Sequence, residues 1–212
     1  MNKHRESLAT YLSNTWHWYL LSMLFIVIIW NFIFGLLDKI PYEEQINLFI
    51  ATHKVNEPEI ENQIYHILED EAVSQVNVDK CVPGNSETFY SILFTRGTTH
   101  TDILILPEET WPDTIFQEYV LGFTEEEIQA LLPPGDYEYL RYDNSIYGIC
   151  VYNCETKESL LPDTWIDYSK DVENRNYYLF INAKSENIGE KNKESKDENT
   201  QVFLLLNKLL SR

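Results

Sequence analysis

Only a few side chains in this chain have types and spacing that could support chemistry at one place. His53 and Glu108 would form an acid/base pair if the fold brought the imidazole and the carboxylate within hydrogen-bonding distance. Thr52 and Trp111 stand close to them along the chain, and the Trp111 ring could stack on a sugar or a peptide. These four are the candidate ligand-binding residues. The commoner alternative is that they are ordinary polar loop residues and a half-buried tryptophan.

Catalytic motifs are absent from the sequence. It contains no nucleophile elbow, no phosphate-binding loop and no zinc-ligand spacing. We therefore expect no enzyme activity, no catalytic residue, no metal site and no cofactor. A hydrolase that uses His53, Glu108 and Cys81 is a distant third hypothesis.

The three cysteines, Cys81, Cys150 and Cys154, allow one disulfide and leave one free thiol. On a straight strand, Cys150 and Cys154 would be about 13 Å apart. A disulfide needs Cα atoms within roughly 7 Å, so this pair requires a turn at Asn153. A bridge from Cys81 to either of the others is equally plausible, and three free thiols are at least as plausible.

The elements that must position these residues follow a β-α-β-α-β pattern. Buried strands are expected at 46–51, 73–78 and 102–107. A helix from Asn56, with Pro58 in its first turn, and a second helix from Ser86 to Arg96-Gly97 connect them. Such connections predict parallel strands with right-handed crossovers. The carboxyl ends then place Thr52 and His53, Lys80 and Cys81, and Glu108 and Trp111 at one edge, with residues 98–101 at the opposite edge.

The second half of the chain is less regular. Thr124 and Glu127 predict a capping box for a short helix. The remaining expected elements are a hairpin with strands at 137–142 and 146–152, a strand at 177–182, a solvated charged loop at 184–198 and an amphipathic helix at 200–210.

Residues 16–37 form an apolar stretch that is long enough to cross a bilayer as a helix. Phe34-Gly35-Leu36-Leu37-Asp38 offers no small-residue cleavage site, which favours an anchor in membrane lipid over a removable signal. Lys3 and Arg5 precede the stretch, so we expect residues 1–15 in the cytoplasm. Residues 38–45 would be a linker, and residues 46–212 an extracytoplasmic domain.

The charge of the chain excludes one class of partner. The formal net charge is −18, and no basic patch interrupts the acidic composition. Nucleic acid should therefore be repelled. The roughly 170 residues after the apolar stretch suit one compact domain with its own core.

Four segments resemble the extracellular solute-binding proteins of ABC importers, which have the type II periplasmic-binding fold. They are INLFIAT and TDILILP in the first half, and YDNSIYGICVYN and YYLFINAKS in the second. The family's "YGiP" motif has Cys150 in place of its proline. The resemblance implies a small α/β domain with a mainly parallel sheet, and ABC transporter subunits as candidate partners.

Two departures from that family affect the expected function. A two-lobed binding protein normally needs well over 250 residues, so this chain has room for about one lobe. An uncleaved helix anchor is the second departure. Our first hypothesis is therefore a membrane-anchored extracytoplasmic binding or accessory module. The alternative is a structural or interaction protein whose acidic ectodomain contacts another membrane or envelope protein.

Overall fold

The computed structural model describes residues 2–37, 40–68, 73–84, 87–110, 118–171, 173–185, 187–188 and 201–211. The chain divides into two compact units, Met1–Ile40 and Pro41–Arg212. The boundary falls inside the linker that the sequence predicts at 38–45, and each unit is described separately.

The first unit is a single helix, α1 (Asn2–Leu37). Its 21-residue stretch Thr15–Gly35 is long and apolar enough to cross a membrane, and its side chains are exposed in the structure. Two polar side chains in the middle of the stretch are satisfied within the helix, because Ser22 donates to the Tyr19 carbonyl and Asn31 to the Val27 carbonyl, both at 2.9 Å. A helix of this kind near the N-terminus serves as a membrane anchor or as a signal sequence.

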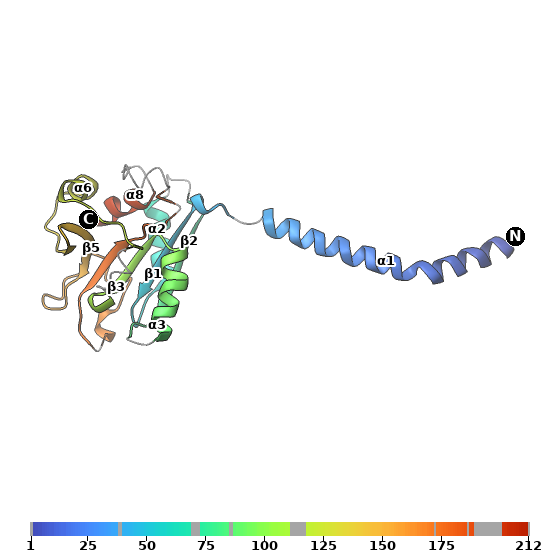
Figure 1. Cartoon of the computed structure of the whole chain (residues 1–212), viewed down its shortest axis with the longest axis horizontal. Helices are drawn as coiled ribbons and strands as arrows, with labels where there is room; N and C mark the ends of the chain where they lie inside the picture. Colours follow the sequence, from blue (N-terminus) through green and yellow to red (C-terminus); the bar gives the residue numbers. More distant parts are fainter. Residues whose placement is uncertain are drawn as a thin grey trace. The chain divides into compact units, whose positions relative to one another are not determined.

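The second unit is built on a six-stranded sheet in the order β2-β1-β3-β6-β5-β4 (Figure 1). The strands are β1 (Gln45–Ala51), β2 (Gln75–Cys81), β3 (Ile103–Pro107), β4 (Tyr139–Tyr142), β5 (Ser145–Tyr152) and β6 (Tyr177–Ile181). Strand β1 pairs in parallel with both β2 and β3. The first three strands therefore confirm the predicted β-α-β-α-β arrangement.

Helices cover both faces of this sheet. They are α2 (Glu57–Ile67), α3 (Glu87–Ile92), α4 (Thr98–His100), α6 (Glu125–Leu131) and α8 (Gln201–Leu210). Buried side chains of α2, α6 and α8 pack on one face, whereas Phe89 and Leu93 cover the other (Figure 1). The connection from β1 to β2 and the connection from β2 to β3 cross the sheet in opposite directions. Right-handed crossovers therefore place the helices of these two connections on opposite faces of the sheet.

The expectation of a mainly parallel sheet is wrong, because the sheet is mixed. Strand β6 runs antiparallel to both β3 and β5, and β4 runs antiparallel to β5. The unexpected feature is the direction of β6, because a strand that is buried on both faces carries no signal for parallel or antiparallel pairing. A two-residue turn joins β4 to β5, and Asp143 and Asn144 adopt φ angles of 47° and 67° there. These are the angles of a tight hairpin turn, which confirms the predicted hairpin.

Helix boundaries follow the predictions with two differences. Asn56 stands at the N-cap of α2 and Pro58 in its first turn, but the Asn56 side chain makes no capping hydrogen bond. The helix expected to end at Arg96-Gly97 continues instead, through a π-helical turn (Leu93–Gly97) into α4. Asn85 and Ser86, together with Glu186 and residues 189–198 of the predicted charged loop, lie outside the described residues.

The capping box at the start of α6 is present. The Thr124 backbone N–H donates to Glu127 Oε2 at 2.7 Å, and the Glu127 N–H donates to Thr124 Oγ1 at 3.3 Å. We expect Thr124→Ala to lower the free energy of unfolding by about 1 kcal/mol, because an N-terminal helix donor loses its acceptor. Urea denaturation would measure this. Thr95→Ala is the control, since its hydroxyl donates to the Ser91 and Ile92 carbonyls one turn back and caps no helix N–H group. Equal losses in the two variants would contradict the role of the cap.

Candidate functional site at the carboxyl edge of the sheet

The carboxyl ends of β1 and β3 meet at a switch point of the sheet. The chain leaves β1 toward β2 on one side, and the strands that follow β3 lie on the other side. Ligands of open α/β sheets bind at such a point. Thr52 and His53 follow β1 there, and Glu108 begins a 3-10 turn directly after β3. Strand β6 is antiparallel to β3, and Tyr177 at its start pairs with Pro107 at the end of β3. The first residues of β6 therefore lie at the same edge of the sheet.

A buried ion pair forms the centre of this edge. Arg175 Nε lies 3.0 Å from Asp171 Oδ2, and Arg175 Nη2 lies 3.3 Å from Asp171 Oδ1. The two side chains are 8% and 4% exposed. Tyr177 also donates to Asp171 Oδ2, at 2.6 Å. Burial alone would raise the pKa of Asp171, but the hydrogen bonds from Arg175 and Tyr177 and the Arg175 charge outweigh it and lower that pKa.

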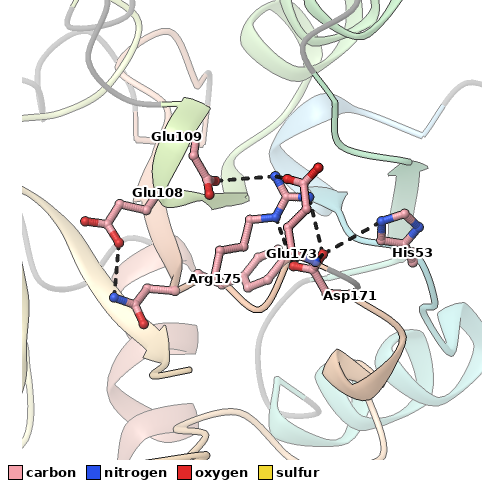
Figure 2. A network of polar contacts seen from close by, with 8 residues as sticks. His53, Glu108, Glu109, Asp171, Glu173 and Arg175 are labelled. Carbon is pink, nitrogen blue, oxygen red and sulfur yellow. Dashed lines mark hydrogen bonds and ion pairs between the residues drawn. The ribbon is translucent and has the colours of Figure 1, made fainter. Parts of the chain in front are cut away.

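Two exposed carboxylates complete the surroundings of Arg175. Its Nη1 lies 2.7 Å from Glu173 Oε2 and 3.4 Å from Glu109 Oε2. Figure 2 shows Arg175 between Glu109 and Asp171, with His53 beyond Asp171. Three carboxylates surround one guanidinium, so the group carries excess negative charge. The two outer carboxylates are solvated, and such contacts are weak and readily exchanged.

His53 and Glu108 have separate partners. His53 Nε2 lies 3.9 Å from Asp171 Oδ1, which is too long for a hydrogen bond, and Glu108 Oε2 accepts from Asn176 Nδ2 at 3.0 Å (Figure 2). The acid/base pair proposed from the sequence is therefore not formed in this structure. Thr52 is 2% exposed, and its hydroxyl has no hydrogen-bond partner in the described part of the chain. Trp111 lies outside the described residues.

A cavity of about 400 Å³ opens beside these residues, between the β1–α2 loop and the segment 163–167. Lys54 Nζ lies 3.0 Å from Asp167 Oδ2 across it. Hydrogen bonds from Ser169 and then from Lys54 lower the pKa of Asp167. The residues that line the cavity are Lys54, Val55, Asn56, Asp163, Thr164, Trp165 and Asp167. Their polar and aromatic groups could hold a small polar ligand.

Most of these residues are not predictable from the sequence. Asp167, Asp171 and Arg175 come from the irregular segment between β5 and β6, which has no periodic pattern. Their position depends on the direction of β6. The one available signal was the predicted strand at 177–182, since an antiparallel orientation would have placed its start beside the end of β3.

The three cysteines are free thiols, and Cys81 and Cys150 are buried. Burial, with Glu138 as the second cause, raises the pKa of Cys150 to about 12, and burial raises the pKa of Cys81 as well. The chain does turn at Asn153, whose Oδ1 accepts from the Glu155 and Thr156 N–H groups. A raised pKa keeps a thiol protonated, which works against Cys81 as a nucleophile.

Metal ligands do not gather at this edge. Among the described residues, no group of three or more histidine, cysteine, aspartate or glutamate side chains is arranged to hold a metal ion.

Comparison of the chain with protein-family models, with curated proteins and with solved structures finds no match. The residues and their geometry are therefore the basis for a proposed function.

Proposed function

We propose that this chain is a membrane-anchored extracytoplasmic binding or accessory module whose ligand site is the cavity beside the β1–α2 loop. The helix α1 supports the anchor, and the four segments that resemble ABC-importer solute-binding proteins support the kinship. By that kinship, the module would work beside transporter subunits in the same membrane.

The observation that carries the proposal is a cavity lined by the loop that follows β1, one of the two strands at the switch point of the sheet. Its volume of about 400 Å³ falls in the range of small-molecule sites, which is roughly 300–1,000 Å³. His53, which lies 3.9 Å from Asp171, and Lys54, which lines the cavity, are neighbours in the loop from β1 to α2. A solute in the cavity would meet groups from two segments of the chain, 54–56 and 163–167.

Charge narrows the class of ligand. Asp163 and Asp167 line the cavity with Lys54 as the one cation among its lining residues, and Glu109 and Glu173 stand nearby with the Arg175 group. An anionic solute would be repelled by these carboxylates. Neutral polar solutes such as sugars, and cationic ones such as amines or basic amino acids, are therefore the expected ligands.

A thermal-shift screen of the full chain in detergent micelles tests this proposal. Sugars, amino acids, amines and short peptides are the panel. We expect one neutral or cationic class to raise the melting temperature, because a ligand at a hundred times its Kd stabilises the folded state by about 2.7 kcal/mol.

Matched variants locate the binding. Asp167→Asn removes a carboxylate of the cavity, the partner of Lys54, and Arg141→Gln breaks the exposed Arg141–Glu125 pair elsewhere. The first should reduce the shift and the second should preserve it. If no compound shifts the melting temperature, solute binding is wrong, although an accessory role is not affected.

One observation favours the alternative, a structural or interaction protein. Residues Pro41–Arg212 form one compact unit, so no second lobe of this unit is available to close over the cavity. A partner protein would then cover the edge that a second lobe covers in a binding protein. Pull-down of the full chain from its membrane in detergent tests this, and recovery of the chain alone would argue against it.

A further inference from the structure

A fully buried carboxyl group lies at the opposite edge of the sheet from the candidate site. Asp102 precedes β3 and is 0% exposed. It accepts hydrogen bonds from the Asn47 N–H at 2.7 Å, from Ser185 Oγ at 2.5 Å and from Asn187 Nδ2 at 3.0 Å. All three donors are neutral. A carboxyl taken out of water without a cation is strongly biased toward its protonated form.

Two of those donors belong to one short segment that follows β6. This segment, of which residues 182–185, 187 and 188 are described, is fixed at both ends. Asn182 Nδ2 donates to the carbonyls of Thr98 and Thr101, and Ile188 is fully buried in the core. Asn187 Nδ2 also donates to the Gln45 carbonyl at 2.6 Å. Among the described residues that bond to the Asp102 carboxyl, Asn47 belongs to β1, whereas Ser185 and Asn187 form a wall outside the regular strands and helices.

Charged side chains near Asp102 contact other groups or are exposed. Glu44 accepts from Ser74 ahead of β1, and Lys184 lies over the Tyr119 ring at 4.0 Å. Arg96 and His100 are exposed on the π-helical turn and α4. Among the described residues, no ion pair links any of these side chains to Asp102.

We propose that Asp102 acts as a protonation-controlled latch that holds Ser185 and Asn187 against β1 and loosens them when the carboxyl ionises. The negative charge needs water, and the strands on the other sides are fixed by sheet hydrogen bonds. Moving Ser185 and Asn187 is the least costly way to admit water, because it breaks hydrogen bonds of loop residues. Asn182 and Ala183 stay held by backbone hydrogen bonds to Asp102 and Tyr119. Ser185 fits both states, since its hydroxyl donates to the carboxylate and accepts from the protonated acid.

The direction of the pH effect follows from the raised pKa. Burial raises the pKa of Asp102 in the closed state, and the hydrogen bonds from Ser185, Asn47 and Asn187 oppose this only in part. The stabilisation of the closed segment is complete below about pH 3.9, the pKa of an exposed aspartate, and is lost as the pH rises through the raised value. Opening should increase by up to about tenfold per pH unit in that window and then level off.

Hydrogen–deuterium exchange of the full chain in micelles, from pH 4.5 to 8, tests the latch. Peptides that cover 182–188 are compared with peptides of α2, after correction for intrinsic exchange rates. We expect the segment to lose protection with rising pH while α2 does not. In Asp102→Asn, the amide Oδ1 can accept from Asn47 and Asn187 while its Nδ2 donates to Ser185, so the protection of the segment should not change with pH.

Equal pH trends in the wild type and in Asp102→Asn would overturn the proposal, as would loss of protection in α2 together with the segment. If Asp102→Asn does not fold, Ser185→Ala decides the question. This variant removes a donor to the ionised form and should raise the Asp102 pKa, so the segment should open further at the upper end of the pH range. An unchanged profile in Ser185→Ala would then refute the latch.

Discussion

Arg175→Met is expected to lower the free energy of unfolding by about 3–5 kcal/mol, because it leaves the Asp171 carboxylate buried without its charge partner. The Asp171 side chain is only 4% exposed and is held by two nitrogens of the Arg175 side chain. Arg175→Lys should recover part of this loss, since an ammonium keeps the charge but cannot make the two-nitrogen contact. Urea denaturation at pH 7 measures both variants.

The same variant has a defined pH dependence. The pKa of Asp171 is lowered in the folded wild type, so its ion pair contributes stability above about pH 3.9 that is lost as the pH falls through the folded value. The difference between wild type and Arg175→Met should therefore shrink in acid. Arg141→Met is the matched control, because it breaks an exposed ion pair of 2.6 Å and should change stability little at any pH. A similar loss in both variants would contradict a special role for the buried pair.

Trp165→Ala is expected to have the second large effect, a loss of about 3–5 kcal/mol. Trp165 is 1% exposed, and its indole N–H donates to Gln63 Oε1 on α2 at 2.8 Å. It fixes the segment 163–167, one wall of the cavity, to that helix. Trp165→Phe keeps most of the buried ring and loses the hydrogen bond, so it should cost less than the alanine variant.

Chemical denaturation of the full chain in micelles ranks these variants, with Leu160→Ala as the control because Leu160 is 40% exposed. If Trp165→Ala costs no more than Leu160→Ala, the segment 163–167 is not fixed by this side chain, and the cavity beside it is not a preformed site. This outcome would also weaken the proposed solute binding.

Local patterns in the sequence predicted most of the elements correctly. The Thr124–Glu127 capping box and the hairpin around Asp143-Asn144 follow from hydrogen bonds and dihedral preferences of neighbouring residues. The stripe of Ile60 and Ile64 on α2 follows from helical periodicity. Thr52, His53 and Glu108 were placed at one edge because the first three strands are parallel, and the structure has them there.

Strand direction was decided only by the tertiary structure. All five residues of β6 are buried on both faces, and a uniformly apolar strand carries no signal for parallel or antiparallel pairing. The expectation of a mainly parallel sheet failed for that reason. For the same reason Asp171 and Arg175 were not predicted to be part of the site, since they lie at this edge only because β6 starts there.

The sequence by itself determined one apolar helix, an acidic α/β domain and the edge where its first strands end, because these depend on composition and on short-range periodicity. Only the tertiary structure decided which side chains share that edge with His53, and that Asp102 is buried among neutral donors. Arg175 is separated from Glu109 by 66 positions, and Asp102 from Ser185 by 83. Contacts of that range are fixed by how the strands pack, and no local pattern encodes them.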